Sequence, residues 1–319
     1  MIGIAHLETV LPSGRMTLEE MARQSGLSSQ DLLDEIGVET KAVLGDSETA
    51  MGLAIEAAKR LVANAGVAVE EIDFILFCSC GPFEKDFWSP AAKVQKEIGA
   101  PRAFSFDVLN GCNSGNLGLH LASNLLQAHA DKSLALVIVA DALSPLVDYA
   151  DPQQSCIYNF SDAASALLLR KSETRNRILS FAASTNALFA DHMSLEPGSQ
   201  RIAMNTDEEE DRALSAEYRA RYAEMIREAL RLAGLGVDQM DHLFMNQGDH
   251  RLIRRLTEAL DLPAEKIFQS YRTHGHLGGT DVFFGLKSWL DEGLVKPGDH
   301  CVLASSAFGF SWGATVIRA

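Results

Sequence analysis

Residues 104–126 contain the side chain best suited to covalent chemistry. The stretch opens with a short apolar strand pattern, breaks at Asn110-Gly111 and continues as a helix with one apolar face. Cys112 is therefore expected on a strand-to-helix turn, at or within the first turn of the helix. Unpaired N–H groups and the helix dipole lower the pKa of a thiol there and favour the thiolate. The pattern predicts a nucleophile; a buried structural cysteine in a tight glycine-rich turn is the alternative.

Two later segments offer groups that can handle protons for such a nucleophile, as acyl transfer requires. One is the polar turn that begins at Asn246, where an apolar strand ends. The other is the glycine-rich turn 271–281, which leads into an apolar helix. His276 and Asp281 lie five residues apart across this turn and helix start, so the carboxylate can orient the imidazole. A histidine that is merely hydrogen-bonded in a tight turn is the alternative.

Two weaker signals complete the set of candidate site residues. Gly309 lies on a loop between two apolar strands, and its N–H can face that of Cys112 to form an oxyanion hole. His274 and His276 are separated by one residue, as two ligands of a metal ion can be. No third ligand at a spacing typical of a metal site appears nearby. We therefore expect no metal site.

The helices and strands that position these residues can be predicted from alternating helical patterns and apolar runs. The runs 72–80 and 133–140 are nearly continuous, as expected for strands buried on both faces. Helical patterns cover 17–36, with a cap near Ser28, and 48–66. These alternations predict an α/β protein.

An internal repeat divides the chain. Residues 65–74 compare with residues 233–242, offset by 168 positions, and each copy lies between a helix and an apolar strand. The later strands follow in matching order; chance similarity of such joints is the alternative. We predict two similar α/β halves. Residues 1–170 carry Cys112, and residues 171–319 carry the His/Asp and Asn loops.

Composition and charge exclude several classes of protein. A net charge of −15 argues against a nucleic-acid partner, because phosphate binding requires a basic face. No apolar run approaches the roughly 20 residues of a membrane helix. Five scattered cysteines and the absence of a signal-peptide pattern indicate reduced thiols. We therefore expect a cytoplasmic enzyme that acts without membrane or nucleic-acid partners.

These pieces together resemble the β-ketoacyl-acyl-carrier-protein synthase III family of the thiolase fold, over nearly the whole chain. The resemblance implies a five-layer αβαβα fold of two pseudo-duplicated halves and a homodimer with the Phe87-Trp88 loop at its interface. It also implies a tunnel to a cysteine that accepts an acyl group from coenzyme A or a carrier protein, with no permanently bound cofactor. The motifs that carry it are Ile36-Gly37-Val38, Ala65–Ile75, Phe106-Asp107-Val108 before Cys112, Phe160–Ala164 and Phe308–Gly313.

The chain departs from the decarboxylating members of that family. Those members have histidine in the motif that here begins at Asn246, and asparagine where this chain has His276. The spacing from His276 to Asp281 resembles instead a branch with a cysteine, histidine and aspartate set. Members of that branch acylate hydroxyls of small acceptors or load starter units in polyketide assembly. Acylating an alcohol or amine requires a base, which a carboxylate-held histidine supplies.

The chain also differs from the family at the positions that contact the acyl donor. Family positions that often hold tryptophan and arginine against the adenine of coenzyme A fall here on about Asp31 and Glu35, which would repel phosphates. The helix after the Asn246 turn carries a basic cluster. We expect this cluster to dock an acidic carrier protein, with a solvated helix face as the alternative; it consists of Arg251, Arg254 and Arg255.

The sequence thus predicts an acyltransferase that takes an acyl group onto Cys112 and passes it to a hydroxyl or amine acceptor. His276, oriented by Asp281, deprotonates the acceptor, and Asn246 polarises or positions it. A condensing or starter-unit loading enzyme that forms a β-ketoacyl product is the first alternative. A noncatalytic partner subunit of a condensing heterodimer is the second.

Overall fold

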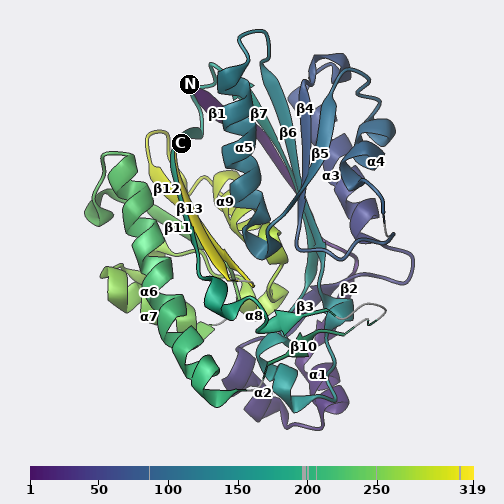
Figure 1. The fold of residues 1–319 in the computed structure, drawn as a ribbon, viewed down its shortest axis with the longest axis vertical. Helices are drawn as coiled ribbons and strands as arrows, with labels where there is room; N and C mark the ends of the chain where they lie inside the picture. Colours follow the sequence, from purple (N-terminus) through teal and green to yellow (C-terminus); the bar gives the residue numbers. More distant parts are fainter. Residues whose placement is uncertain (86, 196–198, 200, 206, 249, 309) are drawn as a thin grey trace.

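The computed structural model describes residues 1–85, 87–195, 199, 201–205, 207–248, 250–308 and 310–319. Nine strands form one mixed sheet in the order β11-β12-β13-β8-β1-β7-β6-β4-β5 (Figure 1). They are β1 (Ile2–Val10), β4 (Phe74–Ser79), β5 (Phe104–Leu109), β6 (Leu134–Ala142), β7 (Asp162–Lys171), β8 (Arg177–Thr185), β11 (His242–Met245), β12 (His300–Ala307) and β13 (Ser311–Arg318). Two short pairs lie outside it: β2 (Gly14–Thr17) with β3 (Thr40–Val43), and β9 (Met193–Ser194) with β10 (Ala203–Met204).

Helices begin and end at capping residues that the sequence supplies. Ser28 caps the second of the two helices within the predicted segment 17–36, and Gly26, with φ 72°, ends the first. Thr49 and Gly66 bound the helix predicted over 48–66. The described helices are α1 (Leu18–Ser25), α2 (Ser29–Ile36), α3 (Ala50–Ala65), α4 (Pro90–Ile98), α5 (Ser114–Ala128), α6 (Glu208–Leu232), α7 (His250–Leu260), α8 (Tyr271–His274) and α9 (Asp281–Asp291).

The large sheet consists of two parts that share one pattern of strand pairing. In the first part β4 is parallel to β6, β6 antiparallel to β7, and β7 antiparallel to β1. In the second part β11, β12, β13 and β8 repeat these relations in the same order. The two parts meet at β1 and β8 through the pair Gly3 and Arg177. We propose the boundary between the halves at residues 170 and 171, at the last residue of β7.

Three hydrophobic clusters divide the molecule into five layers. Helices α3 and α4 pack on the outer face of the first part of the sheet, and α6 and α7 pack on the outer face of the second. Helices α5 and α9 lie between the two parts and share one cluster with strands of both (Figure 1). This arrangement confirms the predicted αβαβα fold.

A smaller cap covers the end of the sandwich where the chemistry is expected. Its cluster joins α1 and α2 to the segment before β7 and includes Cys112 itself. Lys41 of β3 is buried within this region, and its Nζ donates to the carbonyls of Tyr158 and Phe160 at 2.9 and 2.5 Å. The cap therefore fixes the backbone beside the nucleophile.

No described helix combines the length and apolar character needed to cross a membrane. No group of three or more His, Cys, Asp or Glu side chains suited to a metal ion occurs among the described residues.

Candidate active site

Cys112 lies beyond the carboxyl end of β5, on a 3₁₀ turn (Gly111–Asn113) that runs directly into α5. Its side chain is buried at 4% exposure. Gly111 has φ 53°, and a Cβ there would lie 2.6 Å from the Cβ of Ala307, so the turn requires glycine. The structure thus has the strand, turn and helix that the sequence predicts around Cys112.

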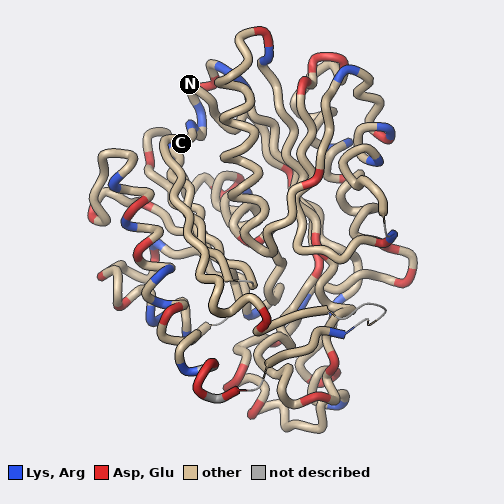
Figure 2. Tube along the Cα trace, in the orientation of Figure 1, with Lys and Arg blue, Asp and Glu red and all other residues tan. Residues whose placement is uncertain are grey.

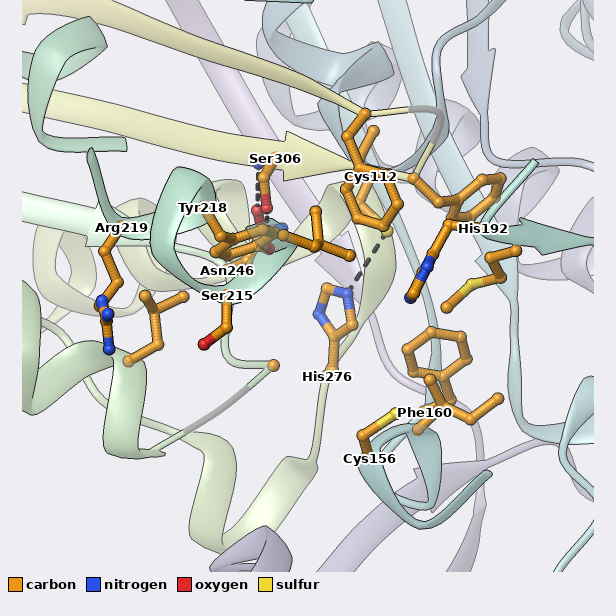
Figure 3. Close-up of a pocket in the computed structure, with 18 of the residues that line it drawn as sticks. Cys112, Cys156, Phe160, His192, Ser215, Tyr218, Arg219, Asn246, His276 and Ser306 are labelled. Atoms are coloured by element: carbon orange, nitrogen blue, oxygen red, sulfur yellow. Dashed lines mark hydrogen bonds between the residues drawn. The ribbon is translucent and has the colours of Figure 1, made fainter. Parts of the chain in front are cut away.

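His276 faces Cys112 although the two residues are 164 positions apart in sequence. The Nε2 atom of His276 lies 3.3 Å from the Sγ atom of Cys112 (Figure 3). The backbone of His276 donates to the carbonyl of Asn159 at 2.8 Å and accepts from the N–H of Ser161 at 2.9 Å. The ring also packs edge-on against Phe160. The segment before β7 therefore sets the position of the imidazole.

Asp281, the first residue of α9, holds the other side of the His276 ring. Its Oδ2 atom accepts from Nδ1 of His276 and from the N–H of Gln247, the latter at 2.8 Å. Its Oδ1 atom accepts from the N–H of Leu277 at 2.9 Å. The carboxylate is buried at 1% exposure, and the start of a helix favours its negative charge. Because Nδ1 donates to Asp281, Nε2 is the ring nitrogen directed at the thiol.

Asn246 follows β11 and is held by three hydrogen bonds. Its Oδ1 atom accepts from the N–H of Ser306 at 2.6 Å and from the hydroxyl of Tyr222 at 2.9 Å. Its Nδ2 atom donates to the carbonyl of Gly278 at 3.3 Å. The oxygen is thus engaged by the protein, and the remaining amide hydrogen is what Asn246 can offer to a ligand.

One of the two predicted donors of the oxyanion hole lies among the described residues. Cys112 supplies a backbone N–H at the turn before α5. Gly309, the other predicted donor, lies outside the described residues.

The electrostatics of the site favour a thiolate opposite an imidazolium. The hydrogen bond from Cys80 and, after it, the charge and hydrogen bond of His276 together lower the pKa of Cys112 to about 7, against the effect of burial. Burial works to lower the pKa of His276, but Asp281 and Cys112 outweigh it and raise that pKa well above its usual value. Such an ion pair activates the sulfur as a nucleophile.

A largely apolar cavity of about 310 Å³ opens in front of these side chains. Figure 3 shows Cys112 and His276 facing each other, with Asn246 beside them and Arg219 further away on α6. Tyr218 hydrogen-bonds Ser306 in the wall behind. The cavity can accommodate an acyl chain beside the thiol, with polar groups confined to a few positions.

Three residues near the site were not predicted from the sequence. Cys80 brings its Sγ atom to 3.4 Å from that of Cys112. Tyr222 holds Asn246, and His192, hydrogen-bonded to Glu210 at 3.2 Å, lines the cavity. A signal for Cys80 existed in the sequence. It follows a strand that is parallel to the strand before Cys112, and such strand ends meet at one edge of a sheet.

The predicted docking cluster lies on α7, where Figure 2 shows basic positions close together. Arg254 and Arg255 are exposed, and Arg255 also lines the cavity. Arg251 pairs with Glu35 of α2 through two contacts, at 3.2 and 3.3 Å. Glu35, one of the two acidic residues noted above, therefore offsets part of the positive charge of the cluster.

Comparison with known proteins gives matches along the whole chain. The family model for 3-oxoacyl-[acyl-carrier-protein (ACP)] synthase III matches residues 106–187, and the model for the C-terminal part of the same proteins matches residues 230–319. The chain is 27% identical to β-ketoacyl-[acyl-carrier-protein] synthase III of Rhizorhabdus wittichii over 317 residues, which is 97% of each protein. The protein of that name from Trichormus variabilis is also 27% identical, over 99% of this chain and 98% of its own length.

Solved structures give the same result. The 3-oxoacyl-[acyl-carrier-protein] synthase III of Aquifex aeolicus superimposes over 100% of both chains with a TM-score of 0.91 and 25% identity. The two family models, the five-layer fold and the cysteine at the strand-to-helix turn all indicate the same family. The chain belongs to the β-ketoacyl-[acyl-carrier-protein] synthase III family.

Proposed function

We propose that this member of the family is an acyltransferase that loads an acyl group onto Cys112 and passes it to a hydroxyl or amine acceptor. The observation that carries the proposal is the hydrogen bond from Nδ1 of His276 to Asp281. It leaves Nε2 as the proton-exchanging atom 3.3 Å from the sulfur. A base oriented by a carboxylate fits the deprotonation of an alcohol or amine.

Loading begins from the thiolate–imidazolium pair. The Cys112 sulfur attacks the carbonyl carbon of the donor thioester, and the new C–S bond forms as the bond to the donor sulfur breaks. The N–H of Cys112 stabilises the oxyanion between these events, and we propose Gly309 as its partner. The donor leaves as a thiol after taking the proton from Nε2 of His276. The step ends with a neutral imidazole beside a thioester, which is the state that the second step requires.

Transfer reverses the proton movement. Nε2 of His276 takes the proton of the acceptor as its oxygen or nitrogen attacks the Cys112 thioester. The C–O or C–N bond forms and the C–S bond breaks, which regenerates the thiolate and the imidazolium. Asp281 stabilises the imidazolium that forms, and Asn246 is proposed to position the acceptor through its remaining amide hydrogen.

Condensation is the second candidate, because the relatives named above are β-ketoacyl synthases over their whole length. That reaction, when it decarboxylates a malonyl donor, requires hydrogen-bond donors for a developing enolate. His276 and Asn246 can supply one each from exchanged positions. Against this, the hydrogen bond to Asp281 makes Nε2 of neutral His276 an acceptor rather than a donor.

The donor is proposed to be a carrier-protein thioester in the first place and a coenzyme A thioester in the second. The relatives carry the acyl carrier protein in their names, and α7 offers exposed Arg254 and Arg255 to an acidic partner. A homodimer is proposed as well, and Phe87, fully exposed in the single chain, is the side chain expected at its interface.

Mass spectrometry of the intact protein tests loading and identifies the donor. Wild type and Cys112→Ala are incubated with a panel of acyl-carrier-protein and acyl-coenzyme A thioesters. A gain of one acyl group on wild type alone supports the covalent step. No gain with any donor on the panel would contradict it and favour a noncatalytic partner subunit.

Release of carbon dioxide from malonyl donors separates transfer from condensation. We expect the acyl-enzyme to pass its acyl group to alcohols or amines without such release. Carbon dioxide formed in step with loss of the acyl-enzyme, and absent with Cys112→Ala, would instead identify a condensing enzyme.

A further inference from the structure

The nucleophile has a second thiol as its neighbour. Cys80 follows β4, and its Sγ atom lies 3.4 Å from the Sγ atom of Cys112. The two cysteines follow parallel strands that pair in register up to Ser79 and Leu109. The contact is therefore set by the main sheet.

A buried carboxylate fixes Cys80 in place. Asp141, near the end of β6, is 2% exposed. Its Oδ1 atom accepts from the N–H of Cys80 at 2.7 Å and from the hydroxyl of Ser79 at 3.1 Å. Its Oδ2 atom accepts from the N–H of Gly279 at 2.8 Å, in the loop that also carries His276. One side chain thus holds both the backbone at Cys80 and the loop of the proposed base.

The environments of the two sulfur atoms differ in a way that assigns the direction of their hydrogen bond. Burial raises the pKa of Cys80 well above its usual value, and the negative charges of Asp141 and Cys112 raise it further. Cys112 faces Nε2 of His276, whose positive charge favours the thiolate. Cys80 therefore keeps its proton and is the donor, and the sulfur of Cys112 is the acceptor.

We propose that Cys80 is a positioning residue that donates its S–H to the Cys112 thiolate, so that the resting nucleophile has a hydrogen-bond donor on each side. This inference rests on the proposed role of Cys112 as nucleophile. The contact acts twice in the proposed cycle. It holds the thiolate before loading, and it stabilises the same sulfur as a leaving group when the acceptor displaces it.

The charged groups around this contact come from several elements. His276 precedes α9, with Asp281 behind it on α9 itself, and Asp141 approaches from β6. His192, hydrogen-bonded to Glu210, lines the same cavity. Substitution of Cys80 leaves all of these groups in place, so a change in the titration of Cys112 would report the thiol contact.

The rate of alkylation of Cys112 by iodoacetamide, measured against pH in a buffer with a phosphine reductant, tests the proposal. Wild type, Cys80→Ser and Cys80→Ala are compared, and the modified residue is identified by peptide mapping. We expect Cys80→Ala to move the midpoint upward by about one pH unit, which lowers the rate roughly fivefold at pH 7 and about tenfold below pH 6. Cys80→Ser keeps an O–H donor, so we expect its profile to lie close to that of wild type.

An unchanged midpoint in Cys80→Ala would overturn the proposal, and so would a serine variant that behaves like the alanine variant. Thermal unfolding of each variant shows that the comparison is made on folded protein. Should Cys80→Ala not fold, alkylation of Cys80 in Cys112→Ala decides: a thiol that resists the reagent near pH 7 supports the donor role, and one that reacts readily contradicts it.

Alkylation needs no acyl donor, so the two proposals fail separately. A shifted midpoint in a protein that never loads an acyl group supports the thiol contact and contradicts the acyltransferase. Acyl loading together with an unchanged midpoint in Cys80→Ala supports covalent loading of Cys112 and contradicts the thiol contact.

Discussion

Asp281 accepts a hydrogen bond from Nδ1 of His276 at the first turn of α9, and the same oxygen accepts from the N–H of Gln247 at 2.8 Å. This carboxylate therefore joins the loop of the proposed base to the loop of Asn246. It orients the imidazole by contacts that are buried from solvent.

Asp281→Asn should separate loading from transfer. An amide at this position no longer stabilises the imidazolium and favours the wrong tautomer, so we expect transfer to fall by about 10²–10⁴-fold. Loading should remain detectable, and the acyl-enzyme should accumulate in intact-protein mass spectra. Asp291→Asn, at the exposed end of the same helix, is the matched control. Transfer at the wild-type rate in Asp281→Asn would rule out the proposed role of the carboxylate.

Loading should depend on pH through the Cys112 thiolate. Because the pKa of Cys112 is lowered to about 7, the thiolate is populated above that pH and is lost as the pH falls below it. We expect the rate of loading under single-turnover conditions to rise from pH 5.5 and level off above about pH 8. A rate that keeps rising toward pH 9 would indicate an ordinary thiol.

Lys41→Met should destabilise the fold near the site. The buried amino group of Lys41 donates to two carbonyls in the segment that holds His276, and losing both bonds is expected to cost about 1–3 kcal/mol. Chemical denaturation measures the change, and Lys59→Met on the exposed face of α3 is the control. An unchanged denaturation midpoint would show that Lys41 does not support the cap.

The same residue gives the stability a pH dependence. Burial lowers the pKa of Lys41 from 10.5 to about 7. Between these values the unfolded chain holds a proton that the folded chain releases, so this group's contribution to stability rises with pH. The difference between wild type and Lys41→Met should therefore widen from pH 7 to pH 9, and a constant difference would contradict the assignment.

Arg254→Glu should weaken loading from a carrier protein more than loading from a short acyl-pantetheine thioester. The exposed charge of Arg254 on α7 can attract an acidic carrier, and this residue is not among the described residues that line the cavity. We expect about a tenfold loss in kcat/KM with the carrier protein at low salt, and a smaller loss at high salt. Arg60→Glu, a surface arginine on α3, is the control. Equal losses with both donors would place the effect outside carrier docking.

Local pattern was sufficient to predict the elements that carry the site. Cys112 follows an apolar run and precedes an amphipathic helix, so its turn could be read from neighbours in sequence. His276 and Asp281 are five residues apart, which put both in one loop. The five-layer fold came from the family resemblance, and the strand pairing agrees with it. The catalytic roles of these residues stay predictions.

Contacts between segments that are distant in the sequence could not be predicted from local patterns. Tyr222 meets Asn246 and Arg251 meets Glu35 only because α6, α7 and α2 converge on the cap end of the molecule. Periodicity in α6 indicates which face is buried, but it does not identify the partner. The pairing of Arg251 with Glu35 could not be predicted for that reason, since the two residues are 216 positions apart in sequence.

The proposed nucleophile and base come from opposite parts of a sheet whose two parts meet at β1 and β8. Cys112 lies beyond β5, and His276 lies between β11 and β12. Local opening of either part would pull the pair apart, so the competent state exists only while both remain closed. Cys112 and His276, which precede α5 and α9, both line the cavity. Amide hydrogen exchange should therefore slow in both helices when an acyl chain fills the cavity. The geometry of the Cys112–His276 pair would in this way depend on the cooperative stability of both parts of the fold.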